Sequence, residues 1–277
     1  MAPMLSVKNL RVSFPTHRGR VEVVKGISFD LGRERLGIVG ESGSGKSMTG
    51  RAILKLIRKP GLVTADRMDF DGIDLTQQTE KQMRAIRGAR ISMVMQDPKF
   101  SLNPVMTIGA QIAEAVVTHE KLGRGEVRDR MLSMLEAVRI NDPKRVAGLY
   151  PHEVSGGMGQ RIMIAMMLIP GPELLIADEP TSALDVSVQA QVLDIIDNLV
   201  TAKGMGLILI SHDLNLVSRY CDRILVMNAG TVVEECAAGQ LEQAQHPYTR
   251  GLLAAMPVIN ETRDELPVLD RSQWAGT

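Results

Sequence analysis

Apolar and polar residues alternate along the first part of the chain. The apolar positions there include Leu5, Val7, Leu10, Val12 and Phe14. Such alternation is typical of strands with one buried face. A turn is predicted at residues 15–20 and a further strand at residues 21–31. The start of the chain therefore predicts two or three antiparallel strands.

Short, largely apolar runs recur farther along, at residues 36–39, 91–95, 174–177 and 206–210. Runs of this kind are typical of strands buried on both faces of a parallel sheet. Hairpins are predicted around Asp71-Gly72 and around Asn228-Ala229-Gly230.

Helical periodicity fills the stretches between these runs. It covers residues 46–60, 80–90, 108–117, 126–138 and 187–199, and a further helix extends from Ser155 to about Leu168. The pattern predicts an α/β protein with a mixed, largely parallel sheet. An antiparallel β subdomain precedes that sheet, and an α-helical subdomain is inserted at about residues 97–168.

A glycine-rich stretch, GESGSGKS, follows the first buried run. It comprises Gly40, Glu41, Ser42, Gly43, Ser44, Gly45, Lys46 and Ser47. The glycines let the backbone curl with its N–H groups inward, and the helix behind them adds a positive dipole end. Lys46 offers a charge for phosphate oxygens, and the Ser47 hydroxyl is a suitable Mg²⁺ ligand. This strand–loop–helix segment predicts a phosphate-binding loop.

Polar residues stand at the ends of the other buried runs. They are Gln96, Asp178 with Glu179, and His212. Because parallel strands end at one edge of a sheet, we expect these groups to meet the loop. Asp178 is suited to be the carboxylate beside a metal ion. Glu179 could orient or deprotonate a water, and His212 could hydrogen-bond a γ-phosphate. Each residue also has a simpler interpretation: Gln96 is only a polar strand end, Asp178 and Glu179 cap the next helix, and His212 is structural.

The overall composition excludes several classes of protein. Lys+Arg and Asp+Glu both total 32, so no global field favours nucleic acid or an anionic membrane. Cys221 and Cys236 lack metal-ligand spacing and predict no disulfide framework. We find neither a membrane-spanning apolar stretch nor a signal peptide, so we expect any membrane connection to need another subunit.

Five motifs in order give a family resemblance. They are GESGSGKS, Gln96-Asp97-Pro98, SGGMGQR from Ser155, LLIADEPTSALD from Leu174, and Ser211-His212-Asp213. Together they resemble the nucleotide-binding subunits of ABC transporters. The resemblance covers residues 4–257 and implies a P-loop NTPase core of the ABC ATPase type. Residues 258–277 are expected to form an irregular tail.

The resemblance also implies roles by position. Lys46 and the loop backbone would bind ATP phosphates, Ser47 and Gln96 would coordinate Mg²⁺, and Asp178 would hold the metal. Glu179 would be the catalytic base, with His212 sensing the γ-phosphate. The signature residues Ser155, Gly156 and Gly157 would reach the ATP of a second subunit, with Asp185 at the dimer contact. Phe14 fits either an adenine-stacking position or a strand core.

Two segments resemble the dipeptide, oligopeptide and nickel importer branch. They are MVMQDPKFSLNPVMTIGAQ at residues 93–111 and HPYTRGLL at residues 246–253. The branch implies a second ATPase subunit in a homodimer or heterodimer, two transmembrane permeases, and a periplasmic or extracellular binding protein. It places the chain peripherally on the cytoplasmic face of the membrane. Peptide-type members often carry a cysteine cluster that binds iron–sulfur, and we expect none here because no cysteine follows Cys236.

Other readings stay open at this point. The cargo is a peptide in the leading reading, with nickel, a metallophore, an opine or glutathione as alternatives. Gly159, where relatives usually have a larger residue, leaves open a regulatory half with low activity. Arg33-Glu34 also replaces the usual Gly-Glu pair. A soluble ABC ATPase acting on DNA or ribosomes is the remote alternative.

Overall fold

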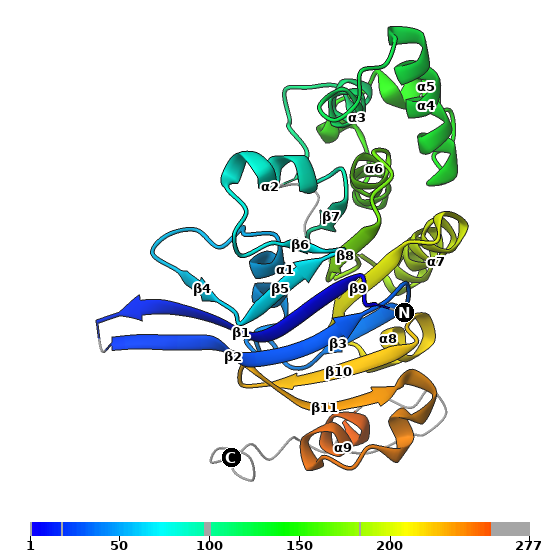
Figure 1. Ribbon diagram of the computed structural model, residues 1–277. Coiled ribbons are helices and arrows are strands. Elements are labelled where there is room, and N and C mark those ends of the chain that lie inside the picture. Colours follow the sequence, from blue (N-terminus) through cyan, green and yellow to red (C-terminus); the bar gives the residue numbers. More distant parts are fainter. Residues whose placement is uncertain (1, 18, 97–100, 183, 256–277) are drawn as a thin grey trace.

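The computed structural model describes residues 2–17, 19–96, 101–182 and 184–255. Within these residues the strands form two sheets, and helices lie around and between them (Figure 1). The predicted α/β class is confirmed. The loop residues Asp97 and Pro98 and the predicted tail at residues 258–277 lie outside the described residues.

The first sheet is antiparallel, as predicted. Its strand order is β2-β1-β5-β6, and β4 pairs with β1. The bounds are Leu5–Thr16 for β1, Gly19–Leu31 for β2, Leu62–Thr64 for β4, Arg67–Phe70 for β5 and Ile73–Asp74 for β6. The turn predicted at residues 15–20 is shorter than expected, because Pro15 pairs with Arg20 and Thr16 with Gly19. A hydrogen bond from Thr16 Oγ1 to the Gly19 carbonyl oxygen, 2.8 Å long, closes the turn.

The second sheet has the order β11-β10-β3-β9-β8-β7. Strands β10, β3, β9, β8 and β7 are parallel, and β11 is antiparallel to β10. The bounds are Arg35–Val39 for β3, Ile91–Val94 for β7, Leu174–Asp178 for β8, Gly206–Ser211 for β9, Arg223–Asn228 for β10 and Thr231–Ala237 for β11. The apolar runs of the sequence are thus the parallel strands of this sheet.

Successive residues of the parallel strands face two different cores, which explains why the runs are largely apolar. In β8, Leu175 and Ala177 join a core under the helices. Leu174 and Ile176 join a second core that includes the antiparallel sheet and helix α1 (Lys46–Ile53). With both faces buried, no position of the strand is available for a polar side chain until its end.

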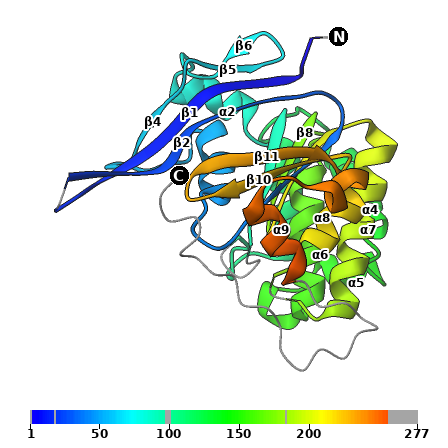
Figure 2. The same cartoon turned by 90° about the horizontal axis from the view of Figure 1, so that it is seen from below.

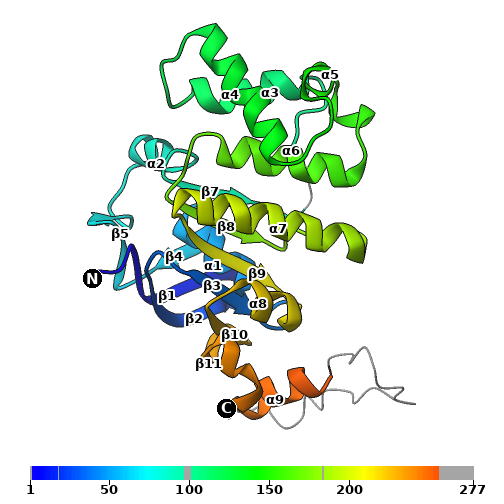
Figure 3. The ribbon, with the colours of Figure 1, turned by 90° about the vertical axis from the view of Figure 1, so that its right-hand side faces the viewer.

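A group of helices lies at one side of the molecule, as Figures 1 and 3 both show. It consists of α3 (Ile108–Val117), α4 (Arg124–Ala137), α5 (Pro143–Ala147) and α6 (Gly156–Leu168), and α6 joins the group to the parallel sheet by packing against β7. Helices α7 (Val186–Lys203) and α8 (Leu214–Tyr220) lie nearer the sheet, and α9 (Pro247–Ala254) lies beside the hairpin of β10 and β11 (Figure 2). No helix in the described part of the chain is long and apolar enough to cross a membrane.

Two predicted helices are shorter than expected, and tertiary contacts give the reason. Helix α1 ends at Ile53 rather than near Pro60, because Lys55 takes a left-handed conformation with φ +51°. Helix α2 (Glu80–Ile86) ends before Arg90. Arg87 becomes extended there, and its Nε donates a 2.7 Å hydrogen bond to the Leu54 carbonyl oxygen. The two helix ends are thus tied to each other.

Candidate functional site

The segment between β3 and α1 is a tight glycine loop. Gly43 and Gly45 have left-handed backbones, with φ of +84° and +99°. A Cβ atom at Gly45 would lie 2.6 Å from the carbonyl oxygen of Val23, so only glycine fits there without a shift. The loop leads directly into α1 at Lys46, whose first turn has backbone N–H groups without helical partners. These are the features of an anion-binding helix start.

Lys46 is buried inside this loop, with 4% of its surface exposed. Its Nζ donates hydrogen bonds to the carbonyl oxygens of Gly40, at 2.8 Å, and Glu41, at 2.9 Å. Burial lowers the pKa of the Lys46 ammonium group, while the negative charges of Glu179, Asp178 and Glu41 oppose that shift. A buried ammonium group gains from a further anionic partner, and phosphate oxygens supply one.

Ser47 and Asp178 form the oxygen-rich side of the site. Ser47 Oγ donates a 2.6 Å hydrogen bond to Oδ1 of Asp178, and Arg51 Nη2 lies 3.8 Å from Oδ2. Burial raises the pKa of Asp178, and the Ser47 hydrogen bond and the Arg51 charge partly offset this. No group of three or more His, Cys, Asp or Glu that could hold a metal ion occurs in the described residues. The hydroxyl and carboxylate fit Mg²⁺, which keeps waters and substrate phosphates as its other ligands.

Three strand ends meet at Glu179. Its Oε2 accepts a 3.3 Å hydrogen bond from Gln96 Nε2 and lies 3.5 Å from Nδ1 of His212. Glu179 itself has φ +47°, a left-handed conformation that costs a residue with a Cβ on the order of 1–3 kcal/mol. The surrounding structure thus holds Glu179 in a strained backbone conformation, with its carboxylate at the same sheet edge as the loop.

A hollow of about 330 Å³ lies beside the loop. Its lining includes Lys46, Ser47, Gln96 and Glu179. The loop, a hydroxyl and a strained acid therefore face one space. That space combines a positively charged site for anions with a carboxylate that can act on a water. These are the groups that phosphoryl transfer needs.

Of the predicted signature residues, Ser155 and Gly156 are exposed and Gly157 is partly buried, and none of them lines this hollow. Ser155 caps α6, where its Oγ accepts a 3.4 Å hydrogen bond from the Met158 N–H, and Gly156 opens the helix. Asp185, at the start of α7, is exposed as well. In a single chain these groups face solvent rather than the loop's own ligand space.

Phe14 is half-buried against the core between the two sheets. A Cβ atom at Gly61 would lie 2.7 Å from Cε1 of the Phe14 ring, so the ring is in close contact with that backbone. The hollow beside the loop is lined from this part of the chain by Val23 instead. The geometry favours the strand-core role over adenine stacking.

Two further residues touch the site without having been given a role from the sequence. Arg51 lies one turn into α1 and faces Asp178. Gln160 is buried in α6, and its Nε2 donates a hydrogen bond to the Pro180 carbonyl oxygen, one residue after Glu179. Gln160 belongs to the SGGMGQR motif, but its partner becomes visible only in three dimensions.

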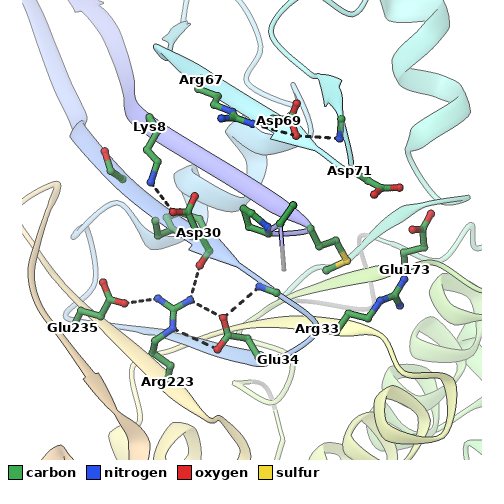
Figure 4. A pocket seen from close by; sticks show the side chains of 17 residues that line it. Lys8, Asp30, Arg33, Glu34, Arg67, Asp69, Asp71, Glu173, Arg223 and Glu235 are labelled. Atoms are coloured by element: carbon green, nitrogen blue, oxygen red, sulfur yellow. Dashed lines mark hydrogen bonds and ion pairs between the residues drawn. The ribbon is translucent and has the colours of Figure 1, made fainter.

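A second hollow, of about 990 Å³, has a different character (Figure 4). It lies at the amino ends of the parallel strands, beside Glu34, Glu173 and Arg223, and so away from the loop. Arg223 bonds Glu34, Glu235 and the Asp30 carbonyl oxygen, and Lys8 bonds Asp30. Several of the charged side chains that line the hollow are thus paired with one another.

Comparison with known proteins gives consistent matches. A family model described as ABC transporter matches residues 24–182. The dipeptide transport ATP-binding protein DppD of Bacillus subtilis (strain 168) is 46% identical over 273 residues, 98% of this chain and 82% of that protein. The oligopeptide transport ATP-binding protein OppD of the same organism is 45% identical over 265 residues, 95% and 74% of the two chains. The glutathione import ATP-binding protein GsiA of Escherichia coli O157:H7 is 47% identical over 264 residues, 92% of this chain and 42% of that protein.

Solved structures agree with these matches. The ATP-binding cassette MJ0796, in a dimeric post-hydrolysis state with ADP and Pi, superposes with a TM-score of 0.76 at 25% identity. The alignment covers 85% of this chain and 99% of that one. A second dimeric structure of the same bacterial ABC transporter cassette gives a TM-score of 0.76 at 26% identity, with the same coverage.

Proposed function

Because the chain belongs to the ABC transporter family of ATP-binding proteins, we propose that it is the motor subunit of a peptide importer, with its catalytic centre beside the glycine loop. It is an ABC ATPase of an import system. The relatives named for dipeptide and oligopeptide transport support the choice of cargo.

The observation that carries the proposed site is the convergence of Lys46, Ser47, Asp178 and Glu179. In the proposal, Lys46 and the loop N–H groups bind the phosphates of ATP, and Ser47 and Asp178 hold Mg²⁺ together with Gln96. When bound, Mg²⁺ supplies positive charge that offsets the charge of the phosphates.

The proposed base is Glu179, which would accept a proton from the attacking water. Its carboxylate is within hydrogen-bond distance of Gln96 and 3.5 Å from His212, so both side chains can fix its direction. His212 does not line the hollow itself, but it lies beside Glu179 with 61% of its side chain exposed, and in the proposal it turns from there toward a γ-phosphate. In the proposal, this chain then supplies the polar groups that position water and phosphate, apart from those that the second subunit contributes.

We place that second subunit at the start of α6. Ser155, Gly156 and Gly157 are partly or fully exposed at a helix N-terminus, where backbone N–H groups suit a phosphate. In the proposal they meet the ATP bound by a second copy or a homologous subunit, with Asp185 at the contact. The dimeric structures of the similar cassette support this arrangement.

The proposed boundaries and partners follow the same reading. Residues 4–257 form the ATPase domain, with the helical subdomain inserted at about residues 97–168 and a tail after it. The partners are two transmembrane permeases and a periplasmic or extracellular binding protein, with no nucleic acid. The chain then works peripherally at the cytoplasmic face of the cell membrane, with ATP and Mg²⁺ and without an iron–sulfur cluster.

Uptake in cells tests the cargo. Cells producing the wild-type chain or Lys46→Ala, together with the permeases of the system, are given labelled dipeptide, glutathione or Ni²⁺. The proposal predicts dipeptide uptake that Lys46→Ala abolishes. Uptake of glutathione alone would favour the second candidate, which the 47% identical glutathione import protein supports. Equal uptake of every compound by both strains would contradict an import role.

A further inference from the structure

Helix α9 contacts the glycine loop through the buried side chain of Tyr248. Tyr248 lies 207 residues after Glu41, and its hydroxyl oxygen accepts a 3.0 Å hydrogen bond from the Glu41 backbone N–H. Tyr248 is 2% exposed. The helix that follows β11 therefore contributes a contact to the phosphate loop, although none of the five sequence motifs includes it.

The contact falls on the Gly40–Glu41 peptide unit, whose Gly40 carbonyl oxygen accepts a 2.8 Å hydrogen bond from Lys46 Nζ. The Glu41 carbonyl oxygen accepts hydrogen bonds from Lys46 Nζ, at 2.9 Å, and from the Ser44 N–H, at 3.2 Å. The Gly230 N–H, in the turn between β10 and β11, donates to the Ser44 carbonyl oxygen at 3.1 Å. Tyr248 and Gly230 thus hold the outer side of the loop, while Lys46 holds its inner side.

Tyr248 is itself fixed by its neighbours. The Tyr248 N–H donates a 3.2 Å hydrogen bond to Nδ1 of His246, which caps α9. Oε1 of Glu234, in β11, accepts hydrogen bonds from the N–H groups of Gln245, at 2.6 Å, and His246, at 3.3 Å. The start of α9 is therefore anchored to β11, which fixes the position of Tyr248 beside the loop.

We propose that Tyr248 is a positioning residue for nucleotide: its hydroxyl holds the Glu41 peptide so that the loop is already shaped for phosphate before ATP arrives. The inference rests on the proposed ATP site. Preorganised groups bind more tightly because less conformational freedom is lost on binding. Tyr248 touches neither ATP nor water in this account, and it acts through the loop backbone.

The first test compares Tyr248→Phe with Tyr220→Phe. Tyr220 is a matched control, since its ring is 8% exposed and its hydroxyl donates a 2.8 Å hydrogen bond to Asp194, away from the loop. We expect Tyr248→Phe to raise the Kd for ATP about fivefold, equivalent to about 1 kcal/mol. We expect Tyr220→Phe to leave the Kd unchanged while it lowers resistance to urea by a similar amount. A general loss of packing would not separate the two variants in this way.

Amide exchange gives a second readout that needs no ATP. The Glu41 amide should exchange faster with solvent in Tyr248→Phe than in the wild type or in Tyr220→Phe. Should Tyr248→Phe fold poorly, His246→Ala and His246→Asn replace it. Alanine removes the cap that holds the first turn of α9, and asparagine restores it, so only His246→Ala should weaken ATP binding.

The outcomes separate this inference from the proposed function. Equal ATP affinity of the wild type and Tyr248→Phe, with unchanged exchange of the Glu41 amide, would overturn the role of Tyr248 and leave the ATP site intact. Equal ATP affinity of the wild type and Lys46→Ala would instead contradict the ATP site itself.

Discussion

Replacing Gln160 with leucine should slow ATP hydrolysis, although Gln160 makes no contact with ATP in the proposed site. Gln160 is buried in α6 and donates its hydrogen bond to Pro180, the residue after Glu179. Leucine is close to glutamine in size, so the main change is the lost donor. The Pro180 carbonyl oxygen is then buried without that partner, which costs about 1–3 kcal/mol of unfolding free energy.

The effect on rate follows from the strained backbone of Glu179. Its φ of +47° is held by nearby hydrogen bonds, including that from the Glu179 N–H to the Ile210 carbonyl oxygen, at 2.9 Å. Loss of the Gln160 restraint lets this segment relax toward an ordinary conformation. Displacements near 1 Å at a catalytic group lower rates by up to about 100-fold, so we predict a fall in kcat of about tenfold with little change in ATP affinity.

The assay measures hydrolysis at saturating ATP and urea unfolding on the same purified samples. Gln111→Leu is the control, because Gln111 is also buried and its Nε2 donates to the carbonyl oxygens of Asn103 and Met106, both at 3.0 Å. Because Gln111 Oε1 also accepts a 2.8 Å hydrogen bond from the Asn103 N–H, Gln111→Leu should lose at least as much stability as Gln160→Leu and keep its kcat. An unchanged kcat in Gln160→Leu, with the stability loss present, would refute the proposed restraint on Glu179.

Two other predictions concern the charges at the second hollow, of about 990 Å³, and the shape of the glycine loop. The hydrogen bond from Arg223 holds the pKa of Glu34 below its usual value of 4.5, so this pair stabilises the protein above that value and loses its effect as pH falls through the lower folded pKa. With side chains 23% and 31% exposed, Glu34→Gln should lower the unfolding free energy by about 1 kcal/mol at pH 7 and by progressively less as the pH falls below 4.5. An equal loss across that range would contradict the role of the pair. Gly43→Ala adds a Cβ that meets nothing within 4 Å, whereas at Gly45 the Cβ meets the Val23 carbonyl oxygen. Urea unfolding should therefore show a loss of about 1 kcal/mol for Gly43→Ala and at least twice that for Gly45→Ala, and similar losses would argue against the steric reason for Gly45.

The fold was predictable where burial alone decides the local pattern. Strands β3, β7, β8 and β9 are largely apolar because each has two buried faces, and the sequence alone shows this property. The end of α1 at Ile53 and the short helix α8 were not predicted. The end of α1 coincides with the contact from Arg87 to the Leu54 carbonyl oxygen, which joins distant elements and leaves no periodic signal. Helix α8 instead begins at a local cap, Asp213, whose Oδ1 accepts hydrogen bonds from the N–H groups of Asn215 and Leu216.

The same distinction applies to the candidate site. Gln96, Glu179 and His212 were expected to meet because parallel strands end at one sheet edge, and the structure brings them together. Gln160 and Tyr248 act on backbone atoms, whose identity does not depend on the residue type of the partner. No pairing rule of side chains could therefore have identified them from the sequence.

Hydrolysis of ATP by the assembled transporter tests the central claim most directly, with Glu179→Gln introduced in this subunit alone. The substitution keeps the shape of the side chain and removes the proton acceptor. Loss of a general base lowers rates by about 10²–10⁴-fold, so turnover should fall by at least about 100-fold while ATP still binds. Turnover close to that of the wild type would show that Glu179 is not the base and would assign hydrolysis to the partner subunit.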